Sequence, residues 1–324
     1  MIKKIGILTS GGDSQGMNSA VSGVIKYAQA QGLETYIIKD GYLGLYNNWI
    51  EKVDSFFADG IISRGGTAAG SARFPEFQEE EIREKAIKNL KDKKIEALVV
   101  IGGDGSYKGA QRLSEMGINC IALPGTIDND ISSSEQTIGF DTALNIIVDS
   151  IDRIRDTSQS HSRCTIIEVM GRHCGDLALY GGIAGGADIV SIGGNPLSEE
   201  DIIEKVTKLK GIVRSVVVVV SEHLYDSVHE LAKKVQEASG FETRASVLGH
   251  IQRGGKPTAM DRFRAFTMGI RAVELILDGK SGLALGNVGE EIVDYPILEA
   301  LEIPRKSRKK LWTQFNNLNI RRIK

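Results

Sequence analysis

Two aspartates in one short loop are the first residues of this sequence whose type and spacing suit catalysis. Asp128 and Asp130 stand in "PGTIDND" (124–130), directly after the apolar run "INCIAL" (118–123), and Thr126 adds a hydroxyl. Open α/β sheets keep their chemistry in the loops at the carboxyl ends of their strands. The pattern therefore predicts a functional loop with a carboxylate available as a general base.

Three glycine-rich segments are suited to binding phosphate: "TSGGDSQGMN" (9–18), "IGGDGS" (101–106) and "RGGTAAGSARF" (64–74). Glycine lets a phosphate approach the backbone, and a helix N-terminus attracts anions. Asp104, inside the second segment, indicates a bridging cation, and Mg²⁺ fits because it binds one or two carboxylates plus phosphate oxygens. Arg73 is a candidate clamp for a transferring phosphate. One such loop alone would more simply be a tight turn, but three with an aspartate loop favour phosphate chemistry.

Short apolar runs alternate with helical patterns along the chain, and together they would position these loops. We predict strands near 5–10, 36–39, 97–103, 120–125, 165–170, 189–194 and 215–223, and helices near 17–31, 79–94, 106–116, 141–157, 198–210, 229–239 and 261–278. Continuous Val/Ile/Leu runs are typical of parallel strands covered on both faces. A chain of 324 residues exceeds the usual size of one core. The prediction is an α/β fold of two doubly wound, Rossmann-like lobes with mostly parallel sheets and an active-site cleft between them.

Composition narrows the function classes. The formal net charge of −2 provides no basic field for nucleic acid or membrane, so neither is expected as a partner. The run "VVVVV" (216–220) is too short to span a bilayer and indicates a buried strand. We interpret the basic segment "RKSRKK" (305–310) as a solvated surface. Three cysteines are too few for a disulfide framework, and a cytoplasmic protein is expected.

Motifs of several phosphate-binding classes are missing from the sequence. It contains no GxxxxGK[ST], no GxGxxG after the first strand, and neither HRD nor DFG. The residues by themselves therefore predict phosphoryl transfer with Mg²⁺ and an aspartate base, and they leave the acceptor open.

Six motifs together resemble the bacterial 6-phosphofructokinases: "GGDSQGMN", "GGTAAGSARFPEF", "VVIGGDGSYKGA", "PGTIDND", "EVMGRHCGDLAL" and "ETRASVLGHIQRGG". They occur in that family's order over nearly the whole chain. The resemblance implies ATP-dependent phosphorylation of the 1-hydroxyl of fructose 6-phosphate, giving fructose 1,6-bisphosphate. It also implies an ATP-binding lobe of residues 1–139 plus 252–304 and a sugar-phosphate lobe of residues 140–251 plus 305–324.

The same resemblance assigns roles to individual residues. Asp128 would be the catalytic base beside Thr126, and Arg73 and Arg172 would offset charge on the migrating phosphoryl group. The ATP contacts implied are Gly12, Arg73, Phe74, Gly103, Asp104, Gly105 and Ser106, with Asp104 also holding Mg²⁺. The implied sugar-phosphate residues are Thr126, Ile127, Asp128, Arg163, Met170, Gly171, Arg172, Glu222, Arg244, His250, Ile251, Gln252 and Arg253.

Two of these features concern the phosphoryl donor and the assembly. Pyrophosphate-using relatives carry Asp at the position of Gly105 and Lys at that of Gly125, so glycine at both indicates ATP. A side chain at Gly105 would fill space needed by the nucleotide, and Gly125 would keep the loop open. Arg163 and Arg244 match arginines that a neighbouring subunit contributes in the family, which implies a homotetramer.

The family's effector site for ADP or phosphoenolpyruvate is only partly matched. The corresponding positions are Ser22, Lys26, Ser55, Arg155, Gly186 and Asp188. Ser22 and Ser55 replace arginines, and each lost arginine–phosphate contact removes about 1.5–3 kcal/mol of binding. Two such losses would weaken effector binding by about 10²–10⁴. We therefore expect weak or absent control by these effectors.

Three other functions compete with this interpretation. A pyrophosphate-dependent phosphofructokinase conflicts with Gly105 and Gly125. A lipid or NAD kinase would share the "GGDG" loop (102–105) but lacks "PGTIDND" and "GHIQRGG" (249–255). A catalytically inactive sugar-phosphate sensor would have no need of Asp128 as a base.

Overall fold

The computed structural model describes residues 2–320, which form two compact units. The first unit comprises the chain up to Ile127, Ile131–Thr142 and Arg253–Arg305. The second comprises Asp128–Asp130, Ala143–Gln252 and the described part of the segment from Lys306. Residues 128–130 thus cluster with the second unit, whereas the sequence placed them in the range of the first lobe. In sequence, the chain passes between the units on either side of residues 128–130, in helix α6 (Phe140–His161), in the short 3₁₀ helix η2 (Gly249–Arg253) and between Arg305 and Lys306.

The first unit is built on a seven-stranded sheet in the order β11-β10-β5-β4-β1-β2-β3. Its strands are β1 (Lys4–Ser10), β2 (Glu34–Ile38), β3 (Ile50–Val53), β4 (Ala97–Gly102), β5 (Asn119–Pro124), β10 (Leu283–Val288) and β11 (Glu291–Pro296). The pairs β2–β3 and β10–β11 are antiparallel, and the other neighbours are parallel. The two antiparallel strands lie at the edges, and the buried centre is parallel, as the continuous apolar runs predicted.

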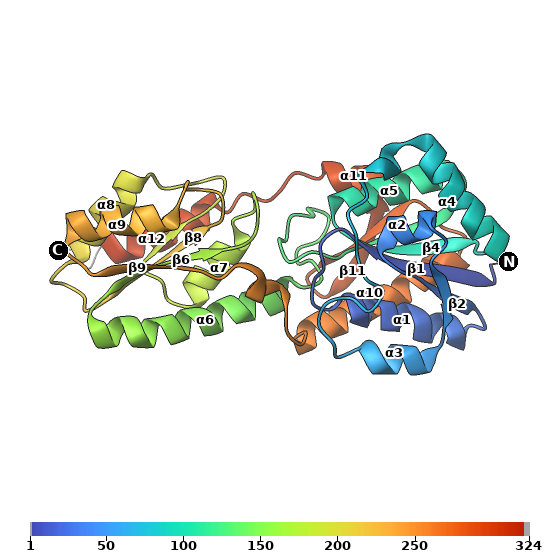
Figure 1. The fold of residues 1–324 in the computed structure, drawn as a ribbon, viewed down its shortest axis with the longest axis horizontal. Helices are drawn as coiled ribbons and strands as arrows, with labels where there is room; N and C mark the ends of the chain where they lie inside the picture. The colour runs from blue at the N-terminus through green and yellow to red at the C-terminus, as the bar shows by residue number, and fades with distance from the viewer. Residues whose placement is uncertain (1, 321–324) are drawn as a thin grey trace. The chain divides into compact units, whose positions relative to one another are not determined.

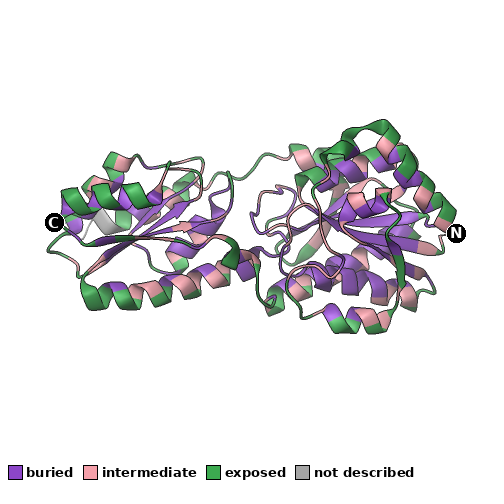
Figure 2. Cartoon of the chain, in the orientation of Figure 1, coloured by how far each residue is buried: buried purple, intermediate pink, exposed green. Residues whose placement is uncertain are grey.

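Helices cover both faces of this sheet (Figure 1). One face packs on α1 (Met17–Ala30), α3 (Ser55–Ile61) and α10 (Ala259–Leu277). The other packs on α2 (Gly41–Tyr46), α4 (Glu80–Lys93), α5 (Asp104–Glu115) and α11 (Ile297–Glu302), and the short 3₁₀ helix η1 (Pro75–Gln78) precedes α4. Figure 2 shows the buried residues concentrated in the strands and on the inward faces of the helices.

The second unit has a four-stranded, wholly parallel sheet in the order β7-β8-β6-β9. Its strands are β6 (Cys164–Val169), β7 (Ile189–Ser191), β8 (Val216–Ser221) and β9 (Thr243–Val247). One face packs on α8 (Glu199–Leu209) and α9 (Val228–Ser239), with α12 (Lys309–Ile320) adding Trp312. On the other side lie α6 and α7 (Asp176–Ala184), which pack closely because Gly181 faces Ile147.

The predicted fold class is confirmed: both units alternate strands and helices around mostly parallel sheets. The seven predicted strands and the seven predicted helices are present, and their ends differ from the predicted bounds by a few residues. The sequence missed β3, β9, β10 and β11, as well as α2, α3, α7, α11 and α12. Among the described residues, no helix is both long enough and apolar enough to cross a membrane.

Candidate active site

The first glycine loop connects β1 to α1 and is held in place by an arginine 240 positions later in the sequence. Arg253 Nη2 donates to the Asp13 carbonyl at 2.9 Å, and Arg253 Nε lies 3.3 Å from Asp13 Oδ1. A Cβ on Gly12 would lie 2.1 Å from Arg253 Nη2, so a larger residue here would displace the arginine side chain. Arg253, predicted as a sugar-phosphate residue, therefore lies beside the first glycine loop within the first unit.

The second glycine loop places Asp104 at the start of α5, where backbone N–H groups lack partners within the helix. Asp104 and Gly105 are exposed, and a Cβ on Gly103 or Gly105 would meet nothing within 4 Å. The buried Ser106 hydroxyl donates to the Ser10 carbonyl at 3.1 Å and fixes this loop to the first one. The result is an open helix N-terminus of the kind that binds phosphate.

The third glycine loop is also tied to the first. Ser71 Oγ donates to the Gly11 carbonyl at 2.7 Å. Next to it, Phe74 packs in an aromatic cluster, with its ring centroid 5.7 Å from that of Tyr46 and 6.4 Å from that of Phe77. Arg73 precedes Phe74 and is exposed. The three loops predicted to bind ATP thus converge in one unit.

The loop after β5 gives a different reason for Gly125 from the one the sequence suggested. A Cβ there would lie 2.8 Å from Met17 Cε and 2.9 Å from Ile101 Cγ2, so this glycine is required by core packing rather than by open space. Thr126 donates its N–H to the Ile138 carbonyl at 3.1 Å, and its own carbonyl accepts from Thr137 Oγ1 at 2.6 Å. A larger residue at 125 would displace the Met17 and Ile101 side chains.

The aspartate loop belongs to the second unit, where Asp128 pairs with Arg172. Arg172 Nε lies 3.2 Å from Asp128 Oδ2, and Arg172 Nη1 lies 3.9 Å from Asp130 Oδ2. The Asp128 residue is only 6% exposed, whereas half of the Arg172 side chain is open to solvent. The carboxylate predicted as the base and a guanidinium predicted to offset charge on the phosphoryl group are therefore brought together within one unit.

Arg172 stands on a strained turn that Glu222 holds. Gly171 has φ +133° and Arg172 has φ +48°, a conformation that costs a residue with a side chain about 1–3 kcal/mol. Glu222 Oε1 accepts the N–H groups of Gly171 at 3.0 Å and Arg172 at 2.8 Å. Gln252 Oε1 accepts the N–H of Met170 at 3.1 Å. Two predicted substrate residues thus fix the backbone that presents Arg172.

Arg163, directly before β6, and Arg244, on the neighbouring strand β9, are also brought together. Both pair with Glu242, with Arg163 Nη2 2.9 Å from Glu242 Oε1. The hydrogen bond from Arg163 holds the pKa of the Glu242 carboxyl below its ordinary value. Glu242 was not predicted from the sequence.

The remaining predicted substrate residues differ in exposure. His250 and Ile251 are exposed on η2, whereas Ile127 is 2% exposed and packs inside the first unit. Only backbone atoms of Ile127 are therefore suited to ligand contact.

The predicted effector positions are mostly engaged in internal contacts. Ser22 is fully buried and donates to the Ala58 carbonyl at 2.9 Å. Lys26 pairs with Asp59. Asp188 Oδ2 accepts the Val217 N–H at 2.9 Å. The other three positions make close contacts of their own: Ser55 donates its N–H to Gln29, and Arg155 bonds the Gly185 carbonyl beside Gly186.

One carboxylate that the sequence did not single out lies directly behind the aspartate loop. Asp176, 1% exposed, accepts from Asn129 Nδ2 at 2.9 Å. Arg308 clamps the same carboxylate with Nε and Nη2, each at 3.1 Å. The segment 305–310 is thus not wholly a solvated surface, because Arg308 compensates a buried charge.

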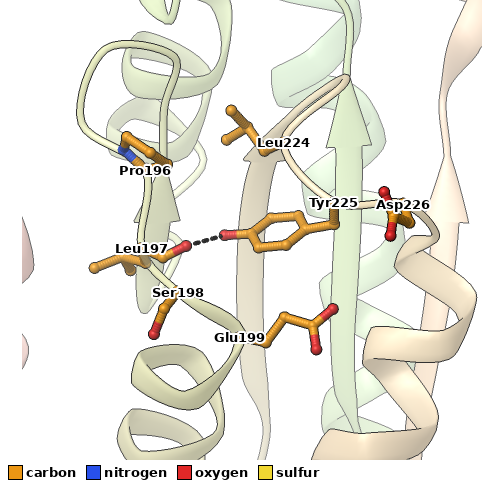
Figure 3. A pocket seen from close by; sticks show the side chains of 7 residues that line it. All are labelled: Pro196, Leu197, Ser198, Glu199, Leu224, Tyr225 and Asp226. Atoms are coloured by element: carbon orange, nitrogen blue, oxygen red, sulfur yellow. Dashed lines mark hydrogen bonds between the residues drawn. The ribbon is translucent and has the colours of Figure 1, made fainter.

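A pocket of about 410 Å³ lies elsewhere in the second unit, between the loops that follow β7 and β8 (Figure 3). Tyr225 points across it and donates to the Leu197 carbonyl at 2.8 Å. The other residues around it are Pro196, Ser198, Glu199, Leu224 and Asp226, and none was predicted to bind a ligand.

The geometry of both units agrees with one protein family. The phosphofructokinase family model matches residues 4–276. The chain is 66% identical over 320 residues to the ATP-dependent 6-phosphofructokinase of Spiroplasma citri, covering 98% of each chain. It is 53% identical over 316 residues to that of Photobacterium profundum, covering 96% of this chain and 98% of the relative.

A solved structure leads to the same family. Phosphofructokinase from Saccharomyces cerevisiae superposes with a TM-score of 0.85 at 33% identity, over 99% of this chain and 48% of the yeast chain. The chain therefore belongs to the phosphofructokinase family, and the prediction from the six motifs is confirmed. Both bacterial relatives are named as the ATP-dependent type of that family.

Proposed function

We propose that this chain is an ATP-dependent 6-phosphofructokinase. It transfers the γ-phosphoryl group of ATP to the 1-hydroxyl of fructose 6-phosphate and produces fructose 1,6-bisphosphate and ADP. The observation that carries the proposal is the buried Asp128 paired with Arg172 on a strained, anchored turn. The 66% identity to a relative named for this activity supports it.

In this mechanism Asp128 takes the proton of the attacking hydroxyl as the bond from oxygen 1 to the γ-phosphorus forms. The bond between the γ-phosphorus and the β,γ-bridging oxygen breaks, and the electron pair leaves with ADP. Arg172 and Arg73 offset charge on the equatorial oxygens of the migrating group, where positioning and electrostatics supply most of the catalysis. Arg172 already lies beside Asp128, so the proposed base and the guanidinium that would stabilise the phosphoryl group are close together.

The nucleotide is assigned to the three glycine loops of the first unit. Gly103 and Gly105 supply backbone N–H groups at the start of α5, and Ser106, Gly12 and Phe74 border them. The space open at Gly105 supports a nucleotide there rather than the aspartate of the pyrophosphate-using relatives. Gly125 no longer supports this choice of donor directly, because core packing alone explains it.

Asp104 is suited to bind the Mg²⁺ that accompanies ATP. Among residues 2–320, no three His, Cys, Asp or Glu side chains cluster to hold a metal. Mg²⁺ suits a single carboxylate because it takes its other ligands from phosphate oxygens and water. When bound, the ion neutralises charge on the β- and γ-phosphates.

The sugar phosphate is assigned to Met170, Gly171, Glu222, His250, Ile251 and Gln252 of the second unit, together with Thr126 and Ile127 of the first. Arg163 and Arg244 would serve the 6-phosphate bound by another copy in a homotetramer. In this chain both arginines pair with Glu242, so a phosphate would compete with that carboxylate for their guanidinium groups. Arg244→Ala is expected to raise the KM for fructose 6-phosphate by about 10–100-fold, the cost of one arginine–phosphate contact. Sedimentation velocity would check the tetramer.

Control by ADP or phosphoenolpyruvate is proposed to be weak. The Ser22 hydroxyl is buried, and Lys26 and Asp188 already have partners within the chain. A clear drop in the half-saturating concentration of fructose 6-phosphate at sub-millimolar ADP would contradict this. A cytoplasmic location is proposed because ATP is the co-substrate, and the three cysteines are buried.

The decisive experiment compares ATP with pyrophosphate as donor, using purified protein, Mg²⁺ and fructose 6-phosphate, with fructose 1,6-bisphosphate as the measured product. Turnover with ATP alone, lost in Asp128→Asn, is the expected result. Turnover with pyrophosphate would keep the family and refute the donor. Binding of fructose 6-phosphate without turnover from either donor would favour a sensor.

A further inference from the structure

A chain of contacts links the C-terminal segment to the residue next to the proposed base. Arg308 donates to both oxygens of Asp176, and the Asp176 carboxylate in turn accepts from Asn129 Nδ2. Asn129 lies between Asp128 and Asp130 and has φ +54°, a conformation that its side chain must help to hold. All of these residues belong to the second unit.

A second contact fixes the backbone of Asn129 from the same turn. Cys174 Sγ lies 3.8 Å from the Asn129 carbonyl oxygen, and it accepts the N–H of Asp176 at 3.4 Å. Arg172, which pairs with Asp128, begins this same turn. The segment 172–176 therefore contacts both the charged side chain and the backbone of the aspartate loop.

The charges make Arg308 the critical member of this chain of contacts. Asp176 is 1% exposed, and a buried carboxylate needs a partner of opposite charge. Arg308 provides a two-point contact that only a planar guanidinium forms. Its guanidinium also lies 5.5 Å from the ring centroid of Tyr180, one turn further along α7, which limits its freedom.

Helix α12 secures the segment that carries Arg308. Trp312 Nε1 donates to the Val190 carbonyl at 2.8 Å, and Asn316 Nδ2 donates to the same oxygen at 3.0 Å. The Val190 N–H donates to Asn316 Oδ1 at 3.1 Å. The helix that directly follows Arg308 is thus attached to β7 by contacts that do not involve Asp176.

We infer that Arg308 is a positioning residue for catalysis: through Asp176 and Asn129 it sets the place of Asp128 relative to Arg172. The inference rests on the proposed role of Asp128 as base. Arg308 touches neither substrate in this scheme, so its loss misplaces the base rather than removing a binding contact. A small misplacement of a reacting group costs up to about 10²-fold in rate.

The test uses Arg308→Gln and Arg308→Lys in the full-length enzyme, with Lys310→Gln as a matched control. Lys310 is exposed in the same basic segment, so its variant removes the same charge. Arg308→Gln is expected to lower kcat by about 10–100-fold, with less than about threefold change in the KM of either substrate. Arg308→Lys keeps the positive charge but lacks the planar guanidinium that contacts both Asp176 oxygens, so it should retain only part of the wild-type kcat. Lys310→Gln should match the wild type.

Thermal unfolding of each variant separates this role from a merely structural one, with kinetics measured well below the lowest midpoint. A lowered midpoint with kcat within twofold of wild type would overturn the inference, since Arg308 would then only fasten the C-terminal segment. Should Arg308→Gln not fold, Arg308→Lys still decides: full kcat in that variant would equally overturn it.

Combining Arg308→Gln with Asp128→Asn in one protein tests whether Arg308 acts through Asp128. If Arg308 acts through Asp128, the double variant loses little beyond Asp128→Asn alone. A further tenfold loss would place the effect of Arg308 elsewhere and refute the inference. Wild-type kcat in Asp128→Asn alone would instead refute the proposed base, which distinguishes failure of the function from failure of the positioning role.

Discussion

The two units contribute different kinds of groups to the proposed reaction. The first unit presents backbone and open space: glycines at 103 and 105 meet nothing within 4 Å, and the loops are fixed by hydrogen bonds such as that of Ser106. The second presents side chains that hold one another, with Arg172 on a strained turn anchored by Glu222. Substitutions in the first should therefore alter mainly nucleotide binding, and those in the second mainly the chemical step.

The largest effect is expected for Asp128→Asn. Loss of a general base lowers kcat by about 10²–10⁴, while the KM for ATP should stay near that of the wild type. Steady-state kinetics with both substrates checks this. Asp149→Asn on α6, where the carboxylate is exposed and pairs only with Arg153, removes an equal charge and should leave kcat unchanged. Equal losses in both variants would point to a general charge effect.

Glu222 tests the anchored turn. Glu222→Ala removes the acceptor of two N–H groups, and a hydrogen bond to a charged group contributes about 1.5–3 kcal/mol, so kcat/KM for fructose 6-phosphate should fall about 10–100-fold. Glu222→Gln keeps an acceptor oxygen and should lose less. If the two variants behave alike, the charge of Glu222 matters rather than its hold on the turn.

Two neighbouring glycines test the first unit. Gly105→Ala should raise the KM for ATP by about tenfold or more, the cost of one contact to a charged phosphate, without lowering the midpoint of thermal unfolding. Alanine is in fact the better helix former. Gly102→Ala is the contrast, because its Cβ would lie 2.3 Å from Ser106 Oγ and 2.5 Å from the Ser10 carbonyl oxygen. It should lower the free energy of unfolding by about 1–3 kcal/mol. An unchanged KM for ATP in Gly105→Ala would move the nucleotide away from α5.

The smallest effect concerns pH. Burial, and then the neighbouring Glu222 charge, raise the pKa of Glu168 above its ordinary value. The folded state thus holds this proton more tightly than the unfolded state, so Glu168 lowers stability as pH rises from about 4.5 through the raised folded pKa. Glu168→Gln should therefore gain stability relative to the wild type at pH 8 but not at pH 4, as measured by urea unfolding. The opposite order would contradict the burial argument.

The sequence predicted those parts of the fold whose signal is local. Continuous apolar runs identified β1, β4, β5, β6 and β8 because each is buried on both faces. The edge strands were missed for the opposite reason. In "EIVDYP" (β11) most residues are at least partly exposed, and "TRASV" (β9) carries polar residues, so neither gives a continuous run.

For the site, the sequence motifs identified functional residues but not the residues that they contact. Asp128 and Arg172 were both predicted, yet their direct pairing and the strained backbone at 172 required coordinates. Arg308 and Asp176 are 132 positions apart, and a basic run gives no indication that one member compensates a buried charge. Likewise Gly125 was attributed to ligand space, because a sequence does not show which side chains face a glycine.

Neither unit is encoded by one continuous stretch, and this affects when each unit can complete its fold during synthesis. The first unit requires β10 and β11, and the second draws Arg308 and α12 from the end of the chain. Many multidomain proteins complete an N-terminal domain while the remainder is still being translated. Here the three glycine loops emerge early, but a nascent chain that stops before Arg308 leaves Asp176 without its arginine. The second unit can therefore complete its contacts only after the segment that carries Arg308 and α12 has been translated.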